Sequence, residues 1–189
     1  MDRSKLRRKQ TENTIYTKSL LTRNILLPMI SVGKNLPYTI EKYMSLNFEG
    51  KCIVEGYVEP KSCKIITYSS GLIKGTNIAF EVVFECNICC PVEGMLIQCI
   101  AKNITKAGIR GESSSETPSP FIVFVTRDHH YMIDYFQTVK ENDKFVARVI
   151  GQRFELNDKY ISIIAELVEP KKDYTKTKAP ILKISSDEI

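Results

Sequence analysis

Apolar and polar residues alternate along much of the chain, and this period of two predicts a fold built mainly from β-strands. The alternation is clearest in residues 78–89, where every second position from Ile78 to Phe84 is apolar, as in a strand with one buried face. Residues 121–126, with the sequence FIVFVT, predict a second strong strand.

The first half of the chain predicts a small α+β unit. Residues 14–27 are rich in β-branched and apolar positions and predict an extended segment. Pro37 then opens a helical pattern, since proline suits the first turn of a helix, and Gly50 suits its C-terminal cap. Three strand-like runs follow, at residues 51–58, 63–68 and 78–89, which gives the order β-α-β-β-β.

The second half predicts a five-stranded barrel. Pro91 and Gly94 interrupt the strand pattern, and a polar loop covers residues 112–119. The strands are expected at residues 95–101, after a turn at 106–108, and at 121–126, 144–152 and 159–168, with a short helix within 129–139. Five short strands with a helix between the third and fourth are typical of an OB barrel, which binds single-stranded nucleic acid or oligosaccharide across one face.

The predicted fold class is therefore α+β and mostly β, with a small β-α-β-β-β domain followed by a five-stranded OB-fold barrel. The expected division is a flexible basic tail at 1–12, a first domain at 13–90, an OB domain at 91–170 and a flexible tail at 171–189. The length of 189 residues allows one core or two, and a hydrophobic fraction of 43% excludes disorder of the whole chain. The sequence contains no run of 18 apolar residues, so it predicts no membrane-spanning helix.

The formal charge of +5 first suggests a nucleic-acid-binding protein, but the excess lies at the ends of the chain. Residues 1–23 carry seven basic and two acidic groups, and residues 24–90 are balanced. Residues 91–170 have a net charge of −2, and residues 171–189 have +2. The predicted barrel is thus slightly acidic, so we expect only weak, sequence-independent RNA binding that falls steeply with salt.

The cysteines indicate a reduced, intracellular chain. The N-terminal sequence MDRSKLRRKQTENT is polar throughout and lacks the apolar segment of a secretory signal, so the six thiols are expected to be free. Only Cys86 and Cys89 form a C-x-x-C motif, and a zinc site would need a second pair. The motif lies within an alternating strand pattern, which favours core packing, and we expect no metal and no cofactor.

The chain has two histidines, His129 and His130, and no recognisable catalytic motif. Neighbouring side chains diverge on a strand or a helix, so the two imidazoles are poorly placed to share a metal. A surface or helix-start pair is the ordinary explanation, and contact with a nucleobase or phosphate is the alternative. We therefore expect a protein without catalytic activity of its own.

An ordered set of short motifs resembles one known family, the seventh-largest subunit of eukaryotic RNA polymerase II and its archaeal RNA polymerase counterpart. The motifs are Glu49-Gly50-Lys51-Cys52, Gly56-Tyr57-Val58, Gly71-Leu72-Ile73, Phe80-x-Val82-x-Phe84 ending at Pro91, Gly94 to Cys99, Gly108-Ile109 and Pro120 to Val125. The strands at 144–150 and 160–167 match more weakly, and the resemblance covers roughly residues 14–170.

The chain departs from the family's longer P-F-x-G-E-V-x-x-G stretch, where it has only Pro91-Val92-Glu93-Gly94. Streamlined versions of the family occur in large DNA viruses, and the sequence leaves cellular and viral origins open.

The resemblance implies a non-catalytic subunit of the DNA-directed RNA polymerase stalk. It implies a tip domain that docks on the polymerase core near the clamp and the RNA exit region, and an OB barrel that contacts nascent single-stranded RNA. The implied partners are the largest and neighbouring core subunits, together with a small helical stalk partner of the fourth-largest type, and no membrane. The implied location is intracellular, in the nucleus for a cellular protein, or in the virion and cytoplasmic viral factory for a viral one.

The same resemblance suggests two sets of interface residues. Contacts with the polymerase core are expected at Gly56, Tyr57, Val58, Gly71, Leu72 and Ile73. Contacts with RNA are expected from basic and aromatic residues of the barrel, with solvated surface charge as the ordinary alternative for each basic residue: Lys102, Lys106, Arg110, Phe121, Arg127, His129, Tyr131, Arg148 and Arg153. Alternation along 121–124 allows only one of Phe121 and Phe124 to face RNA.

Three other interpretations remain open on the residues. The chain could be a free-standing OB-fold RNA-binding or translation factor, although the α+β unit before the barrel argues against it. It could also be the equivalent stalk subunit of RNA polymerase I or III. The third interpretation is an enzyme that uses His129 or a cysteine, but the sequence offers no second catalytic group to act with either.

Overall fold

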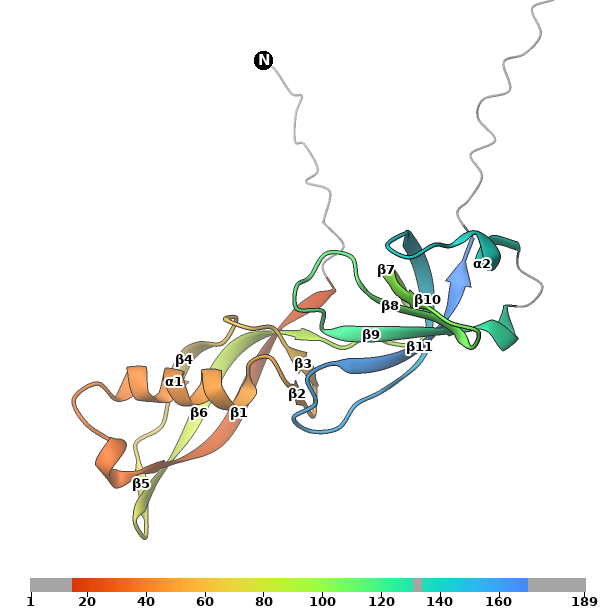
Figure 1. Cartoon of the computed structure of the whole chain (residues 1–189). Helices are drawn as coiled ribbons and strands as arrows, with labels where there is room; N and C mark the ends of the chain where they lie inside the picture. Colours follow the sequence, from red (N-terminus) through yellow and green to blue (C-terminus); the bar gives the residue numbers. More distant parts are fainter. Residues whose placement is uncertain (1–14, 131–133, 170–189) are drawn as a thin grey trace, which may run out of the picture.

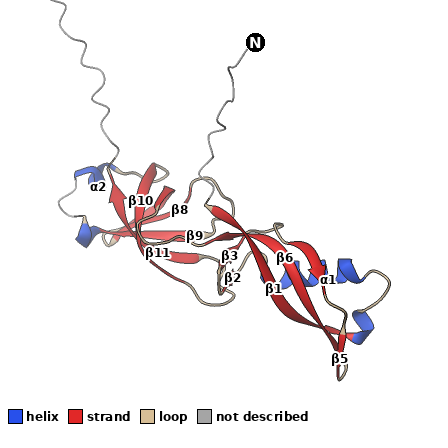
Figure 2. Cartoon of the chain, turned by 180° about the vertical axis from the view of Figure 1, so that it is seen from behind, coloured by secondary structure: helices blue, strands red, loops and turns tan. Residues whose placement is uncertain are grey.

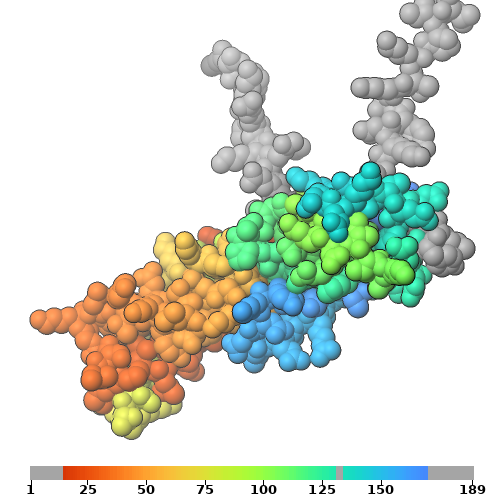
Figure 3. Space-filling model, in the orientation of Figure 1, coloured from red at the N-terminus to blue at the C-terminus, as the bar shows by residue number. Residues whose placement is uncertain are grey.

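The computed structural model describes residues 15–130 and 134–169, which form an elongated molecule with a twisted sheet at one end and a barrel at the other (Figures 1 and 3). The predicted tails at 1–12 and 171–189 lie outside the described residues. None of the helices in the described part is long and apolar enough to cross a membrane.

The sheet, here called the tip sheet, is built on two long antiparallel strands. These are β1 (Tyr16–Pro28) and β6 (Asn77–Cys89), which pair without interruption from Tyr16↔Cys89 to Pro28↔Asn77. The shorter strands β2 (Cys52–Ile53), β3 (Gly56–Val58), β4 (Lys64–Tyr68) and β5 (Leu72–Lys74) complete it, with β3, β4 and β5 each pairing with β6. Alternate residues of β6, from Phe80 to Ile88, are buried, which confirms the period of two.

Helix α1 (Leu36–Phe48) supplies the other half of the tip core (Figure 1). Pro37 lies in its first turn, as expected from the fixed φ of proline. Ile40 and Met44, one turn apart, are fully buried, and the Phe48 ring lies 5.9 Å from that of Phe84. A single turn of 3-10 helix, η1 (Met29–Ser31), joins β1 to the segment before α1.

Two local expectations for the tip were wrong. Residues 51–58 form a hairpin of β2 and β3 and not one strand, because Gly56 turns the chain with a φ of 135° and approaches the next strand closely. A Cβ at Gly56 would lie 2.5 Å from the Cys89 carbonyl oxygen, so only glycine fits there. Leu72 and Ile73 lie between the strands expected at 63–68 and 78–89, yet they form an additional strand, β5, and a turn follows at Gly75, where φ is 62°.

The barrel confirms the OB prediction. Its strands are β7 (Leu96–Ile104), β8 (Gly108–Ser113), β9 (Phe121–Thr126), β10 (Lys144–Arg153) and β11 (Ile161–Val168). They close in the order β10-β11-β9-β8-β7, with β7 paired back to β10 and the β9–β11 pair parallel. Inward residues of all five strands fill the interior, which is a packed core and not a channel.

The connection between β9 and β10 contains the short helix expected within residues 129–139. A 3-10 turn, η2 (Arg127–His129), and the short helix α2 (Asp134–Thr138) flank residues 131–133, which are outside the described part. Phe136 and Val139 are buried and belong to the barrel core. This segment therefore covers one end of the barrel.

The tip sheet and the barrel share a core. They meet where the short strands β2 and β3 lie beside the barrel (Figure 2). Cys52, Tyr57 and Cys89 come from the tip sheet, yet they are buried among the barrel residues. The backbone of Cys52 also pairs with the β10–β11 loop, since its N–H donates to the Asp158 carbonyl at 2.8 Å and its carbonyl accepts from the Asn157 N–H at 2.8 Å. The junction is continuous protein interior and not a flexible linker.

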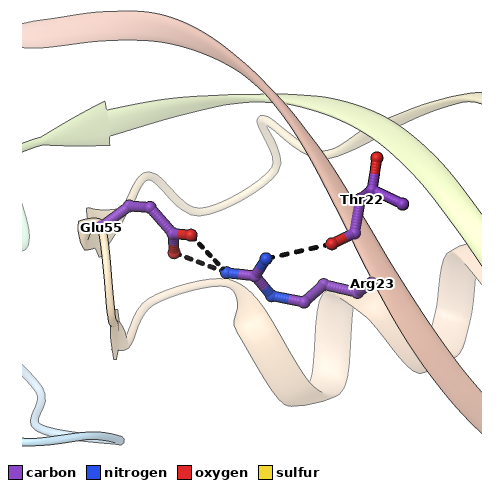
Figure 4. A network of polar contacts seen from close by, with 3 residues as sticks. All are labelled: Thr22, Arg23 and Glu55. Carbon is purple, nitrogen blue, oxygen red and sulfur yellow. Dashed lines mark hydrogen bonds and ion pairs between the residues drawn. The ribbon is translucent and has the colours of Figure 1, made fainter.

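An ion pair holds β1 against the β2–β3 turn (Figure 4). One guanidinium nitrogen of Arg23 lies 2.6 Å from both carboxylate oxygens of Glu55, and the other donates to the Thr22 carbonyl at 3.0 Å. Both side chains are about one-third exposed, at 29% and 34%, so solvent screens the pair only in part.

Candidate nucleic-acid interface on the barrel

One outward row of the barrel combines an aromatic, an aliphatic and a basic side chain. Phe124 on β9 pairs with Arg110 on β8 and, on its other side, with Ile164 on β11. Phe124 is 41% exposed and Ile164 is 51% exposed, although both sit on strands whose alternate residues fill the core. An exposed aromatic ring beside a guanidinium is the arrangement that stacks a base and neutralises its phosphate.

A groove of about 290 Å³ runs from Phe124 to the β7–β8 turn and is lined mainly by apolar atoms. The turn closes through the Thr105 N–H, which donates to the Gly108 carbonyl at 2.9 Å. Gly108 has a φ of 155°, and a Cβ there would lie 2.2 Å from the Val125 carbonyl oxygen. The shape of the groove at this end therefore depends on a glycine.

Basic side chains border the same turn. Arg127 is held beside it, because its backbone N–H donates to the Ala107 carbonyl at 2.9 Å and its guanidinium donates to the Thr105 carbonyl at 3.4 Å. The guanidinium also lies 5.4 Å from the centre of the Phe136 ring. Lys106 lies exposed within the turn, and Lys102 is exposed on β7.

Three of the predicted RNA-binding arginines are paired with carboxylates. The pairs are Arg110 with Glu112 at 3.7 Å, Arg148 with Glu166 at 2.7 Å and Arg153 with Glu155 at 3.3 Å. All six side chains are partly or largely exposed, so the pairs add little stability. They do cancel positive charge locally, which leaves Lys102, Lys106 and Arg127 as the predicted cations without a carboxylate partner within the described residues.

The two histidines have different environments. His129 is exposed, whereas His130 is only 2% exposed. The His130 Nδ1–H donates to the Thr126 carbonyl at 2.7 Å, and Nε2 accepts the Leu167 N–H at 2.8 Å. This pair of bonds defines the neutral Nδ1–H tautomer, and the ring also stacks on Phe136 at 5.6 Å. His130 is a structural residue of the barrel.

One predicted RNA contact is wrong, and another lies outside the described residues. Phe121 is fully buried in the barrel core, because β9 turns odd-numbered residues inward, so it is not accessible to RNA. Phe124 is the exposed phenylalanine that the candidate set missed, and only the alternation along β9 hinted at it. Tyr131 lies outside the described residues.

The end of the tip sheet farthest from the barrel, where β5 lies in Figure 1, also carries exposed apolar side chains. Leu26 and Leu72 flank Ala79 on neighbouring strands and line one groove of about 350 Å³. The adjacent turns add further exposed residues, and the whole set is here called the distal apolar surface: Leu26, Met29, Ile30, Leu72 and Ile73. Ile30 is the extreme case, at 96% exposed.

The predicted core-docking residues fall into two groups. Gly71, Leu72 and Ile73 lie exposed at this distal end. Residues 56–58 lie at the opposite end, where Tyr57 is 1% and Val58 0% exposed. Tyr57 belongs to the junction with the barrel and Val58 to the tip core, so neither is part of the distal apolar surface.

The cysteine arrangement explains why the C-x-x-C motif does not form a metal site. Cys86 faces the tip core, whereas Cys89 faces the barrel core, because residues three apart on a strand point to opposite faces. In the part of the chain that the structure describes, no group of three or more His, Cys, Asp or Glu side chains is placed to hold a metal ion.

Comparison with known proteins gives one informative match. No protein-family model matches the chain. The chain is 27% identical over 179 residues to a protein of Acanthamoeba polyphaga mimivirus, and the match covers 84% of each sequence. That protein is named "Putative DNA-directed RNA polymerase subunit". The chain is a distant homologue of this putative DNA-directed RNA polymerase subunit. The share covered is too large for the tip sheet or the barrel alone, so the homology includes parts of both.

Proposed function

We propose that this protein is a non-catalytic stalk subunit of a multisubunit DNA-directed RNA polymerase. Its tip domain (residues 13–90) docks on the polymerase core near the clamp and RNA exit region, and its OB domain (91–170) contacts nascent RNA. The observation that carries the proposal is the match, over most of the chain, to a viral protein named as a putative DNA-directed RNA polymerase subunit. The viral source of that relative supports a viral setting, in the virion or a cytoplasmic viral factory.

The distal apolar surface is the proposed contact with the largest and neighbouring core subunits. Its members are exposed side chains that water solvates poorly, at the far end of a rigid arm. Burial of an aliphatic side chain of this size contributes about 1.5–3 kcal/mol. Two such residues on one hairpin, Leu72 and Ile73, can therefore dominate the affinity.

Co-purification tests the docking step. A tagged full-length chain should recover the two largest polymerase subunits from the cells in which it is expressed, and the double variant L72D/I73D should lose them. Leu46→Asp is the matched control, because Leu46 is 65% exposed on α1, comparable to Leu72 at 63%, but lies outside the surface. A protein that migrates alone near 21.6 kDa would instead favour a free-standing OB-fold RNA-binding factor.

The RNA contact is proposed at the Phe124 groove, with Arg127 and Lys106 facing the phosphates. Because the barrel segment is slightly acidic and three of its arginines are paired, we expect weak, sequence-independent binding that falls steeply with salt. Stacking of one base on an aromatic ring contributes about 1–3 kcal/mol.

Fluorescence anisotropy with labelled single-stranded RNA at low salt tests this contact. Phe124→Ala should raise the Kd by about five- to a hundredfold, which is the stacking energy expressed as a ratio. Tyr38→Ala removes an aromatic ring that is 59% exposed on α1 and should leave the Kd unchanged. Nanomolar affinity for one defined sequence, or an equal effect of the two variants, would contradict the proposed site.

A further inference from the structure

Two cysteines of the tip sheet face each other across neighbouring strands. Cys63 immediately precedes β4, and Cys86 lies within β6. The antiparallel register pairs Lys64 with Glu85, so one step back along β4 places Cys63 opposite Cys86.

The chain beyond this pair keeps the same alignment. The Asn87 N–H donates to the Ser62 hydroxyl at 3.2 Å, and the Asn87 carbonyl accepts from the Glu59 N–H at 2.9 Å. Cys63 is thus bracketed by contacts on both sides, and its position opposite Cys86 is fixed.

The spacing of such a pair suits a disulfide. Directly opposed residues of antiparallel strands have Cα atoms about 4.5–5.5 Å apart, within the range of about 4.4–6.8 Å found for disulfide-bonded cysteines. Opposed residues also share a face of the sheet, so both thiols lie on the same side of it. Little backbone movement is needed to join them.

The two thiols differ in access. Cys86 is fully buried, whereas Cys63 is partly exposed, which makes it the more accessible of the two. The Glu49 carboxylate accepts the Cys63 N–H at 3.0 Å. The neighbouring Cys86 thiol, burial and the charge of Glu49 raise the pKa of Cys63, while the neighbouring Cys63 thiol lowers the pKa of Cys86.

We propose that Cys63 and Cys86 form a thiol–disulfide site, which low-molecular-weight disulfides such as oxidised glutathione convert to an intramolecular disulfide. Cys52, Cys89 and Cys99 are buried in the barrel core and at the junction, so they lack this access. Cys90 is exposed but is not opposed by a second thiol in its register.

The exchange needs no other reactant. The Cys63 thiolate attacks one sulfur of the oxidised glutathione, which forms a mixed disulfide and releases one glutathione thiolate. The Cys86 thiolate then attacks the Cys63 sulfur and releases the second glutathione. Two protein thiols are oxidised, one glutathione disulfide is reduced to two thiols, and the two protein protons end on glutathione.

The bond would join β4 to β6 and close the loop that carries the β5 hairpin. Cross-linking a loop of this length restricts the unfolded chain, so the oxidised tip should be more stable. The proposal concerns the tip sheet alone and stands whether or not the protein belongs to a polymerase.

Peptide mapping under non-reducing conditions tests the site in the full-length chain, in a Cys90→Ser background that removes the exposed thiol. After incubation with oxidised glutathione, a linked peptide containing Cys63 and Cys86 should form. Its rate of formation should rise about tenfold per pH unit between about pH 7 and 8, because the thiolate is the reactive form. The Tm should rise by about 5–10 °C, and dithiothreitol should reverse both changes.

Two variants in the same background serve as controls. Cys63→Ser should abolish the linked peptide and the Tm shift, whereas Cys99→Ser, which removes a buried thiol in the barrel, should retain both. Recovery of Cys63 and Cys86 as free thiols, or a glutathione adduct on Cys63 that never resolves to the internal disulfide, would overturn the proposal.

Discussion

Replacing His130 with alanine should destabilise the barrel more than any change at its neighbour His129. The His130 ring bridges the ends of two strands, since it donates to the Thr126 carbonyl and accepts the N–H of Leu167. It also stacks on Phe136. Alanine removes all three contacts at a site that is only 2% exposed.

The expected loss follows from these contacts. A buried donor and a buried acceptor are each left unpaired, at about 1–3 kcal/mol apiece. The lost ring stacking adds about 1 kcal/mol. The free energy of unfolding should therefore fall by about 3–7 kcal/mol, which corresponds to a Tm lowered by about 10–20 °C for a chain of this size.

Urea unfolding followed by circular dichroism measures this change. His129→Ala is the control, because His129 is exposed and its loss should stay within about 0.5 kcal/mol. A His130→Ala protein that loses less than about 1 kcal/mol would refute the assignment of His130 as a structural bridge between the strands.

Three further outcomes are expected. Burial raises the pKa of Cys99 from 9.0 to about 12. The stability contributed by the protonated Cys99 thiol should therefore be lost as the pH rises from about 9 to 12. Cys99→Ala should make the free energy of unfolding less dependent on pH over that range. Gly108→Ala should lower the free energy of unfolding by about 2–4 kcal/mol through its clash with a backbone carbonyl, while Gly151→Ala, which meets nothing within 4 Å, should be near neutral. Arg23→Ala should cost about 1 kcal/mol, measured by urea unfolding, against no measurable loss for Lys18→Ala, whose side chain is 68% exposed in its ion pair.

The long strands and the positions of the barrel strands along the chain could be predicted because periodicity and turn residues are local signals. Strand β6 shows this best, since its buried residues follow the alternation from Phe80 onward. The β2–β3 hairpin could not be predicted in the same way. Its turn depends on Gly56 approaching the Cys89 carbonyl, and that neighbour is more than thirty residues away in sequence.

The candidate interface was less predictable, because both faces of β9 carry large apolar residues. Ile122 faces outward and is still only 7% exposed, so hydrophobicity did not reveal which phenylalanine was accessible. The Arg148–Glu166 pair crosses between β10 and β11, and sequence spacing does not show that it cancels a predicted phosphate contact. The tip contacts at residues 56–58 were proposed from a motif whose side chains turned out to be interior.

The shared junction couples the motion of the tip sheet to that of the barrel. Tyr57 and Cys89 are buried among barrel residues, and the backbone of Cys52 is hydrogen-bonded to the β10–β11 loop. Within the described residues, packed protein interior therefore joins the two ends. A rotation of the distal apolar surface should therefore rotate the barrel through the same angle. The resulting displacement of a barrel residue should increase with its distance from the axis of rotation.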